Sequence, residues 1–277
     1  MRTLLVLALV FALGVFVGSK LDALSAAPTP SLKSDPAAVA ERAIAKWDRL
    51  EYLPDGPEVS CPENAIVVAT VGQSNAANSV GQRFASTRAV YEMYYGKCYP
   101  AAGPLVGSDL YAGSYWPIFG DLLIERGFAK AVILVGMAKG NTSVTQWSNR
   151  AGLGGYLARR LSAAHPRYVL WHQGEADSQL GAEYSTHLAL VIDIVRENAP
   201  DAKVLVALAS VCSGGIESGT IRAAQAAAVD TVHGVFAGPN TDTLRGDEYR
   251  YDGCHFNEHG ARVVAAAWAD SVIAAGR

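Results

Sequence analysis

Two segments far apart in this 277-residue chain carry the residue types that nucleophilic chemistry needs. Ser74 follows an apolar, partly β-branched run, and Asp252 stands three residues before His255. A serine hydroxyl is a weak nucleophile until a base takes its proton, and an imidazole is a better base when a carboxylate holds its tautomer. On one short loop, Asp252 can reach Nδ1 of His255 and leave Nε2 free. The pattern predicts attack by Ser74 on an ester.

Polar residues follow three apolar runs that are expected to be strands. Residues 72–75 end the first run, residues 139–143 follow the second and residues 172–177 follow the third. The carboxyl ends of parallel strands meet at one edge of an open α/β sheet, where ligands bind. We therefore expect these residues to lie at one site.

Short apolar runs alternate with helical patterns along the chain. Continuous apolar runs are typical of strands buried on both faces, and repeats of three to four residues are typical of helices. The alternation predicts an α/β protein, a three-layer α/β/α sandwich with a mostly parallel, flavodoxin-like central sheet. The expected strands are residues 65–71, 131–136, 168–171 and 204–209, and the expected helices are residues 38–50, 117–126, 155–165, 182–198, 220–232 and 258–275. Residues 90–95 could form another strand, and residues 103–115 a loop at the site.

The motifs and their order resemble the SGNH (GDSL-like) hydrolase superfamily, in particular its sialate O-acetylesterase and acetylxylan-esterase-like branch. Three blocks of that branch are matched by Gly72–Asn75 (Gly-Gln-Ser-Asn), Gln173–Asp177 (Gln-Gly-Glu-x-Asp) and Asp252–His255 (Asp-x-x-His). A fourth block is matched more loosely by Gly140–Ser143 with Trp147.

The resemblance implies a serine esterase that removes short acyl groups, most often acetyl, from an acylated carbohydrate, with no cofactor. It implies that Ser74 attacks, His255 is the general base and Asp252 orients it. The oxyanion would be held by the backbone N–H groups of Ser74 and Gly140 and by the side-chain amide of Gln173. Neutral donors stabilise such a charge without adding a titratable group. The residues expected to support the site are Gln73, Asn75, Glu175 and Asp177.

Two other functions stay open. A protein of the same fold could transfer the acyl group to a polysaccharide, or a non-catalytic relative could only bind carbohydrate. Glu175 and Asp177 could also indicate paired-carboxylate chemistry, although their position just after a strand favours bracing hydrogen bonds. His172 has no companions at metal-ligand spacing, so no metal is expected. Three aromatic residues could line a sugar cleft or belong to the core: Tyr115, Trp116 and Trp147.

The composition excludes some partners. Half of the residues are hydrophobic, which is enough for one sizeable domain, and the net charge is −3. The chain has no long run of Lys or Arg, so nucleic acid is not an expected partner. The oligomeric state is not indicated.

The amino terminus predicts export. Residues 3–19 are uncharged and rich in Leu, Val and Phe, and they are closed by Lys20. Such a segment is a signal peptide or a minimal membrane anchor. We expect a signal or anchor over residues 1–25, a Pro/Ser-rich linker over 26–36 and the hydrolase domain over 37–277. The protein would be periplasmic or extracellular, either secreted or tethered.

Four cysteines in an exported chain favour disulfides. Of the three possible connectivities, we favour Cys61–Cys98 with Cys212–Cys254, because the second bridge would fix the loop that carries His255. Four buried thiols are the alternative.

Overall fold

The computed structural model describes residues 35–50, 53–212 and 216–277. The expected signal or anchor segment, and all but the last two residues of the expected linker, lie outside these ranges. Within the described ranges, no helix is both long enough and apolar enough to cross a membrane.

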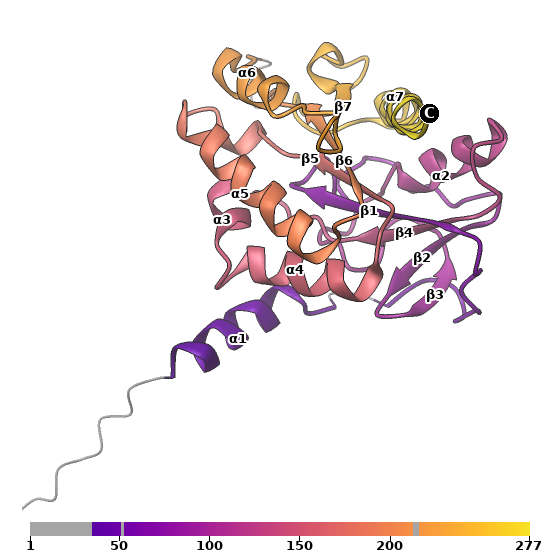
Figure 1. Cartoon of the computed structure of the whole chain (residues 1–277). Helices are drawn as coiled ribbons and strands as arrows, with labels where there is room; N and C mark the ends of the chain where they lie inside the picture. Colours follow the sequence, from indigo (N-terminus) through magenta and orange to yellow (C-terminus); the bar gives the residue numbers. More distant parts are fainter. Residues whose placement is uncertain (1–34, 51–52, 213–215) are drawn as a thin grey trace, which may run out of the picture. The chain divides into compact units, whose positions relative to one another are not determined.

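A seven-stranded sheet with the order β3-β2-β4-β1-β5-β6-β7 lies in the middle of the domain (Figure 1). Neighbouring strands are parallel except for the β2–β3 hairpin. The strands are β1 (Ile66–Gly72), β2 (Val90–Tyr94), β3 (Lys97–Pro100), β4 (Val132–Gly136), β5 (Tyr168–His172), β6 (Lys203–Leu208) and β7 (Val235–Asn240). The order β4-β1-β5-β6-β7 is the flavodoxin-like core, to which the β2–β3 hairpin is added at one edge. The α/β fold expected from the sequence is confirmed.

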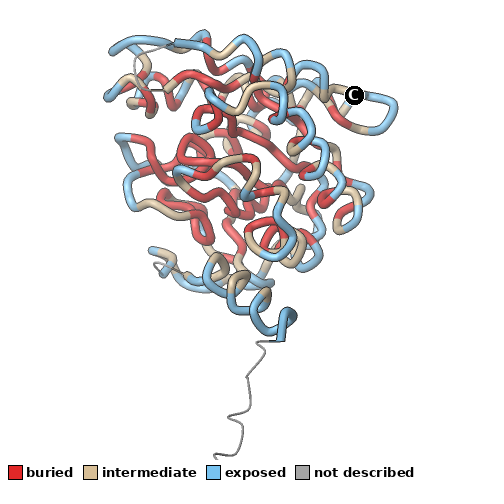
Figure 2. Tube along the Cα trace, turned by 90° about the vertical axis from the view of Figure 1, so that its left-hand side faces the viewer, coloured by how far each residue is buried: buried red, intermediate tan, exposed pale blue. Residues whose placement is uncertain are grey.

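Helices cover both faces of the sheet (Figure 1). They are α1 (Pro36–Trp47), α2 (Trp116–Glu125), α3 (Val144–Ser148), α4 (Leu153–Ala164), α5 (Glu183–Asn198), α6 (Gly219–Ala227) and α7 (Glu258–Gly276). Because side chains alternate along a strand, Val68 of β1 packs with α2 and α7, whereas Ala69 and Val71 pack with α3 to α6. Figure 2 shows the resulting buried interior, with exposed residues along the outer helices.

Three elements differ from the sequence prediction. The β7 strand was not predicted because it contains Gly238-Pro239 and is only partly buried, which is tolerated at a sheet edge. The β3 strand follows a tight turn at Tyr95-Gly96, where both residues have positive φ angles of 45° and 79°. The third element, α3, has only five residues, too few for a helical repeat to show in the sequence.

Three aromatic residues belong to the core and do not line a sugar cleft. Tyr115, Trp116 and Trp147 are all fully buried. The indole N–H of Trp116 donates to the carbonyl oxygen of Ala76 at 2.7 Å, and that of Trp147 donates to Oγ1 of Thr142 at 2.9 Å. These rings therefore hold the loops that follow β1 and β4.

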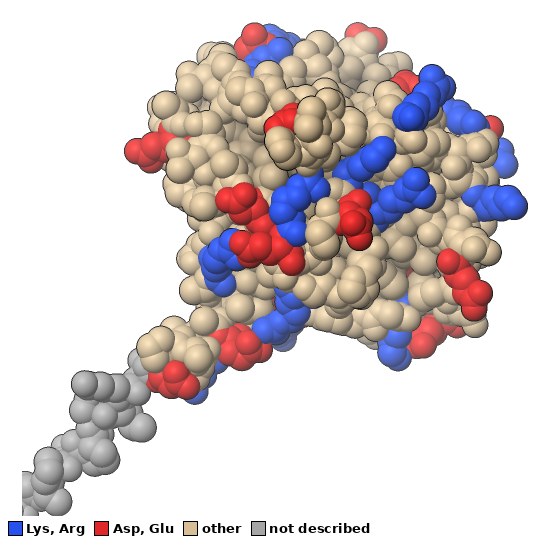
Figure 3. Space-filling model, in the orientation of Figure 1, with Lys and Arg blue, Asp and Glu red and all other residues tan. Residues whose placement is uncertain are grey.

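Both expected disulfides are present. Cys61–Cys98 joins the segment before β1 to β3, and Cys212–Cys254 joins the loop after β6 to the segment before α7. On the surface, an ion pair between Arg159 and Glu41 at 2.7 Å joins α4 to α1. Basic and acidic side chains are interspersed in the centre of the face shown in Figure 3.

Candidate active site

Two glycines let the chain cross closely at the carboxyl ends of β1 and β5. Gly72 has a φ of +138°, and a Cβ there would lie 2.0 Å from the carbonyl oxygen of His172. Gly174 has a φ of +152°, and a Cβ there would lie 2.0 Å from the carbonyl oxygen of Ala209. Only glycine tolerates both the conformation and the contact. The tight crossing sets Ser74 at the carboxyl edge of the sheet.

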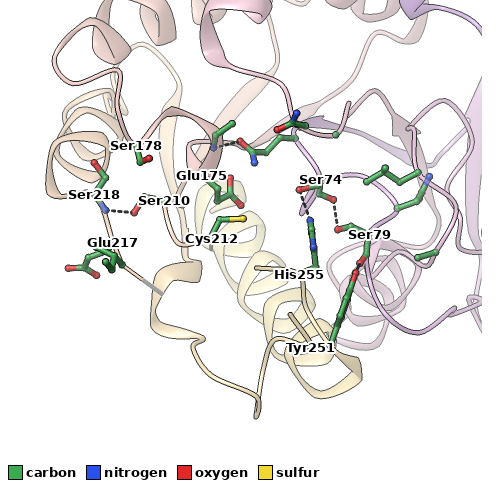
Figure 4. Close-up of a pocket in the computed structure, with 18 of the residues that line it drawn as sticks. Ser74, Ser79, Glu175, Ser178, Ser210, Cys212, Glu217, Ser218, Tyr251 and His255 are labelled. Atoms are coloured by element: carbon green, nitrogen blue, oxygen red, sulfur yellow. Dashed lines mark hydrogen bonds between the residues drawn. The ribbon is translucent and has the colours of Figure 1, made fainter. Parts of the chain in front are cut away.

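The structure brings Ser74, His255 and Asp252 together (Figure 4). Nε2 of His255 lies 3.0 Å from Oγ of Ser74, and Nδ1 lies 2.6 Å from Oδ2 of Asp252. The backbone N–H groups of Cys254 and His255 donate to Oδ1 of Asp252 at 2.9 and 2.6 Å. Partial burial alone would raise the pKa of Asp252, but the hydrogen bonds from His255 and Cys254 outweigh it and lower the pKa. Asp252 is therefore a carboxylate at neutral pH.

Tyr251 and Ser79 support the pair from one side, and neither was predicted from the sequence. The Tyr251 ring stacks on the His255 imidazole, with centroids 5.9 Å apart and planes 27° apart. Its hydroxyl donates to the carbonyl oxygen of Ser79 at 3.0 Å. Oγ of Ser79 in turn donates to the carbonyl oxygen of Ser74 at 2.6 Å. The His255 imidazole is therefore linked, through Tyr251 and Ser79, to the segment that carries Ser74.

Asn75 and Arg250 hold the same loop from beneath. Nδ2 of Asn75 donates to Oε1 of Glu175 at 2.8 Å and to the carbonyl oxygen of Cys254 at 3.2 Å. The buried Arg250 also donates to the carbonyl oxygen of Cys254, and to that of Thr241 at 3.0 Å. Burial raises the pKa of Glu175, although the hydrogen bond from Asn75 opposes this. A lone arginine just before Asp-x-x-His gave no sequence signal for this role.

The Cys212–Cys254 bridge lies inside the site, because Cys254 stands between Asp252 and His255. Its other end is fixed by the buried Asp242, which accepts from the N–H of Ser210 at 2.8 Å and of Val211 at 2.9 Å. The loop after β6 and the loop that carries the imidazole are therefore one covalently linked unit.

We expect the paired change Cys212→Ala and Cys254→Ala to lower kcat for ester hydrolysis by about tenfold or more, because a displacement of about 1 Å at a reacting group can reduce the rate substantially. The control is Cys61→Ala with Cys98→Ala, which removes the bridge at β3. Both pairs should lower the melting temperature, since either disulfide stabilises the fold. Equal kcat values for the two double variants would contradict a role for Cys212–Cys254 in positioning.

A pocket of about 960 Å³ opens beside Ser74 and His255. Its lining comes from the loops after β1, β4, β5 and β6 and from the loops before α2 and α7. Figure 4 shows Ser178, Ser210, Ser218 and Glu217 across the pocket from Ser74 and His255. In the part of the chain that the structure describes, no group of three or more His, Cys, Asp or Glu side chains could hold a metal ion.

The expected oxyanion donors are not equally placed. Ser74 lines the pocket, and its backbone N–H has no partner among the described residues. Gly140 also lines the pocket, but its N–H donates to Oδ1 of Asp109 at 2.7 Å. Gln173 differs most from the expectation, because it is fully buried and is not among the described residues that line the pocket.

The Gln173 amide is used inside the protein. Its Nε2 donates to Oε1 of Gln73 and to the carbonyl oxygen of Thr142, both at 3.1 Å, and to Oδ2 of Asp177 at 2.5 Å. Its Oε1 accepts from the Tyr184 hydroxyl at 3.1 Å. Two amide hydrogens already serve three acceptors, so Gln173 has no donor left for a substrate. Asp177 also accepts from Oγ of Ser143 at 2.5 Å and from the N–H of Val144 at 2.8 Å, so it links the loops after β4 and β5.

His172 is buried under the site as a neutral ring. Its Nδ1 lies 3.0 Å from the Tyr115 hydroxyl and its Nε2 lies 3.3 Å from Oγ1 of Thr241. Burial lowers the pKa of His172 to about 3, and the positive charge of Arg250 acts in the same direction. His172 is thus a structural residue of the site floor.

His172 should contribute a loss of stability in mild acid, opposite in sign to the contribution of Glu92, whose pKa is raised by burial to about 8. In the unfolded chain this side chain has an ordinary pKa near 6.5, whereas the folded state lowers its pKa to about 3. Between those values the unfolded state binds a proton that the folded state does not, so the contribution of His172 to the free energy of unfolding decreases as pH falls, by at most about 1.4 kcal/mol per pH unit. Urea unfolding of the parent protein and of His172→Gln at pH 7, 6 and 5 isolates this contribution as the difference between the two slopes. His172→Gln should lose less stability than the parent between pH 7 and pH 5, whereas His259→Gln, an exposed control on α7, should keep the slope of the parent.

Ser74 and His255 line a pocket at the carboxyl edge of an α/β sheet, and comparison with known families identifies the class of enzyme. A family model described as "Carbohydrate esterase, sialic acid-specific acetylesterase" matches residues 112–274, more than half of the chain. The chain belongs to this family, and it is a carboxylic ester hydrolase. The matched part includes Asp252 and His255 and begins after Ser74, so the assignment of Ser74 depends on the geometry described above. None of the curated proteins matches the chain.

Solved structures are similar in fold. A protein from Arabidopsis thaliana is 20% identical with a TM-score of 0.64, over 77% of this chain and 99% of that chain. A carbohydrate acetylesterase from Xanthomonas citri is 14% identical with a TM-score of 0.49, over 75% of this chain and 55% of that chain. A carbohydrate esterase family 3 protein from Talaromyces cellulolyticus is 15% identical with a TM-score of 0.47, over 58% of this chain and 90% of that chain. At such identity, the Arabidopsis thaliana structure shows the fold alone.

Proposed function

We propose that this protein removes acetyl groups from a carbohydrate by a Ser-His-Asp mechanism. The observation that carries the proposal is the 3.0 Å contact between Nε2 of His255 and Oγ of Ser74 at the edge of the pocket. This contact is within the reach that proton transfer to a general base requires. Family membership supports the substrate class, since the family is that of a carbohydrate esterase.

Ser74, His255 and Asp252 carry out the steps of the proposed reaction. Oγ of Ser74 attacks the acetyl carbonyl carbon and gives its proton to Nε2 of His255. The carbonyl electron pair moves onto oxygen, the bond to the sugar oxygen breaks, and the imidazolium returns the proton to that oxygen. Water, deprotonated by His255, then attacks the acetyl carbon, the bond from that carbon to Oγ of Ser74 breaks, the imidazolium returns the proton to Oγ, and acetate leaves. Asp252 holds the tautomer and stabilises the imidazolium throughout.

The test is release of acetate from acetylated oligosaccharides by the purified protein, with formation of the deacetylated sugar followed by mass spectrometry. Equal amounts of acetate and free hydroxyl are expected. Appearance of the acetyl group on an added, unacetylated glycan in place of free acetate would assign the protein as a transferase. Binding of the glycan without release of acetate would assign it as a non-catalytic relative.

We further propose that the protein works outside the cytoplasm, periplasmic or extracellular. The support is the pair of disulfides, because such bridges persist in oxidising compartments and are rare in the cytosol. Fractionation of cells followed by detection of the protein would decide its location.

A further inference from the structure

Gln73 stands directly before Ser74 and lines the same pocket, with only 3% of its surface exposed. Its Oε1 accepts three hydrogen bonds: from Nε2 of Gln173 at 3.1 Å, from the N–H of Ala176 at 3.0 Å and from the N–H of Gly174 at 3.4 Å. Three donors at one end of the amide fix that end as the oxygen. The opposite end of the Gln73 amide must then be the NH₂ group.

The side-chain amides of Gln173 and Gln73 differ in the hydrogen bonds that their nitrogens make. Nε2 of Gln173 is fully engaged within the protein. Nε2 of Gln73, by contrast, donates to no group in the described ranges, although the residue borders the pocket. A buried amide with a fully satisfied oxygen and an available nitrogen can offer its N–H groups to a ligand in the pocket.

We infer that Nε2 of Gln73, together with the backbone N–H of Ser74, holds the oxyanion during acyl transfer, and that Gln173 serves to fix Gln73. This rests on the proposed function and adds a catalytic residue to it. As Oγ of Ser74 bonds to the acetyl carbon, the carbonyl π electrons move onto the acetyl oxygen, and the Oγ proton moves to His255. The new charge on that oxygen is what the Gln73 N–H groups stabilise.

The surroundings of Gln73 strengthen it as a donor. The Tyr184 hydroxyl donates to Oε1 of Gln173, and Nε2 of Gln173 donates to Oε1 of Gln73, so hydrogen bonds run in one direction through both amides. Bonds in such a chain polarise one another. The donor is also held in place before reaction, because its oxygen is fixed by the loop after β5. A fixed donor needs no reorganisation when the charge develops.

The test is Gln73→Glu. A glutamate keeps an oxygen that accepts from Gln173, Gly174 and Ala176, but it has no N–H group to donate and places a negative charge where the oxyanion forms. We expect kcat for an acetyl ester to fall by about 10²–10³-fold with little change in KM, because the neutral carbonyl of the bound ester gains little from this donor. Gln82→Glu makes the same chemical change at an exposed side chain and should leave kcat unchanged.

Labelling of Ser74 by a fluorophosphonate gives a second readout that does not depend on the natural substrate. Phosphonylation also develops negative charge on an oxygen beside Ser74, so Gln73→Glu should slow it by a comparable factor. Gln73→Met, which has similar length and no charge, replaces Gln73→Glu if the glutamate variant does not fold by circular dichroism.

The outcomes separate the two proposals. If the parent protein releases acetate and is labelled at Ser74, but a folded Gln73 variant keeps kcat and the labelling rate within threefold, Gln73 is not the oxyanion donor. If the parent protein neither releases acetate nor reacts with the probe, the proposed function itself fails, and the role of Gln73 fails with it. A large loss in both rates, with KM preserved, supports the assignment.

Discussion

Ser74→Ala is expected to reduce the rate of acetate release by at least about 10⁴-fold, because no other step can form the acyl-enzyme. The change removes one oxygen whose described partner is His255, so the fold should survive. Acetate release and thermal unfolding measure the two effects separately.

Ser185→Ala is the control for Ser74→Ala. This change removes a hydroxyl on α5, where Ser185 lies outside the pocket and, within the described ranges, donates only to the carbonyl oxygen of Ala182 at 2.8 Å. It should keep the full rate. If Ser74→Ala retained more than a few per cent of the activity, a nucleophile other than Ser74 would have to act, and the proposed mechanism would be wrong. Loss of activity together with loss of the folded state would require Ser74→Cys or Ser74→Gly as a second variant.

The parts predicted well from the sequence are those set by local pattern. The strands β1, β4, β5 and β6 are continuous apolar runs, and such runs are typical of strands that are buried on both faces of a parallel sheet. The close approach of Ser74 to His255, 181 residues apart, follows from placing both at the carboxyl edge of that sheet. The Cys212–Cys254 bridge follows from the same placement.

The parts not predicted depend on contacts between distant segments. The sequence does not reveal which of two glutamines, Gln73 or Gln173, faces the pocket, since both occupy block positions just after a strand. The difference comes from Thr142 and Asp177, which draw the Gln173 amide away from the pocket. Arg250 was missed for a similar reason: its role arises from carbonyl oxygens that only the folded loops bring together.

The Asp-x-x-His pattern occurs twice in the chain, so the pattern alone does not identify the catalytic histidine. Asp230 and His233 form a pair with Nδ1 2.5 Å from Oδ2, and Oδ1 of Asp230 accepts from the N–H of Val232 and of His233. This local geometry is close to that of Asp252 and His255. The first pair, however, lies in the turn between α6 and β7 and does not line the pocket that contains Ser74. The local motif builds the hydrogen-bonded Asp–His pair, and only the fold places a serine beside it.

Asp252→Asn is expected to lower kcat by about 10³–10⁴-fold. The reason lies in the hydrogen bonds within the loop that carries Asp252 and His255. The N–H groups of Cys254 and His255 both donate to Oδ1, so the amide oxygen of an asparagine must take that position. Its NH₂ group then faces Nδ1 of His255 and forces that nitrogen to accept. The proton of the neutral imidazole moves to Nε2, which can no longer take the proton of Ser74.

The duplicate pair provides the control for this prediction. Asp230→Asn makes the same substitution in the same local motif, so it should cause a similar small change in stability and no change in kcat. Steady-state rates on one acetyl ester, with melting temperatures for both variants, complete the comparison. Comparable kcat values for Asp252→Asn and the parent protein would show that the tautomer of His255 is set by something other than Asp252. A loss restricted to Asp252→Asn would instead tie the rate to one carboxylate, because the two loops share their local geometry and differ in the serine that faces the imidazole.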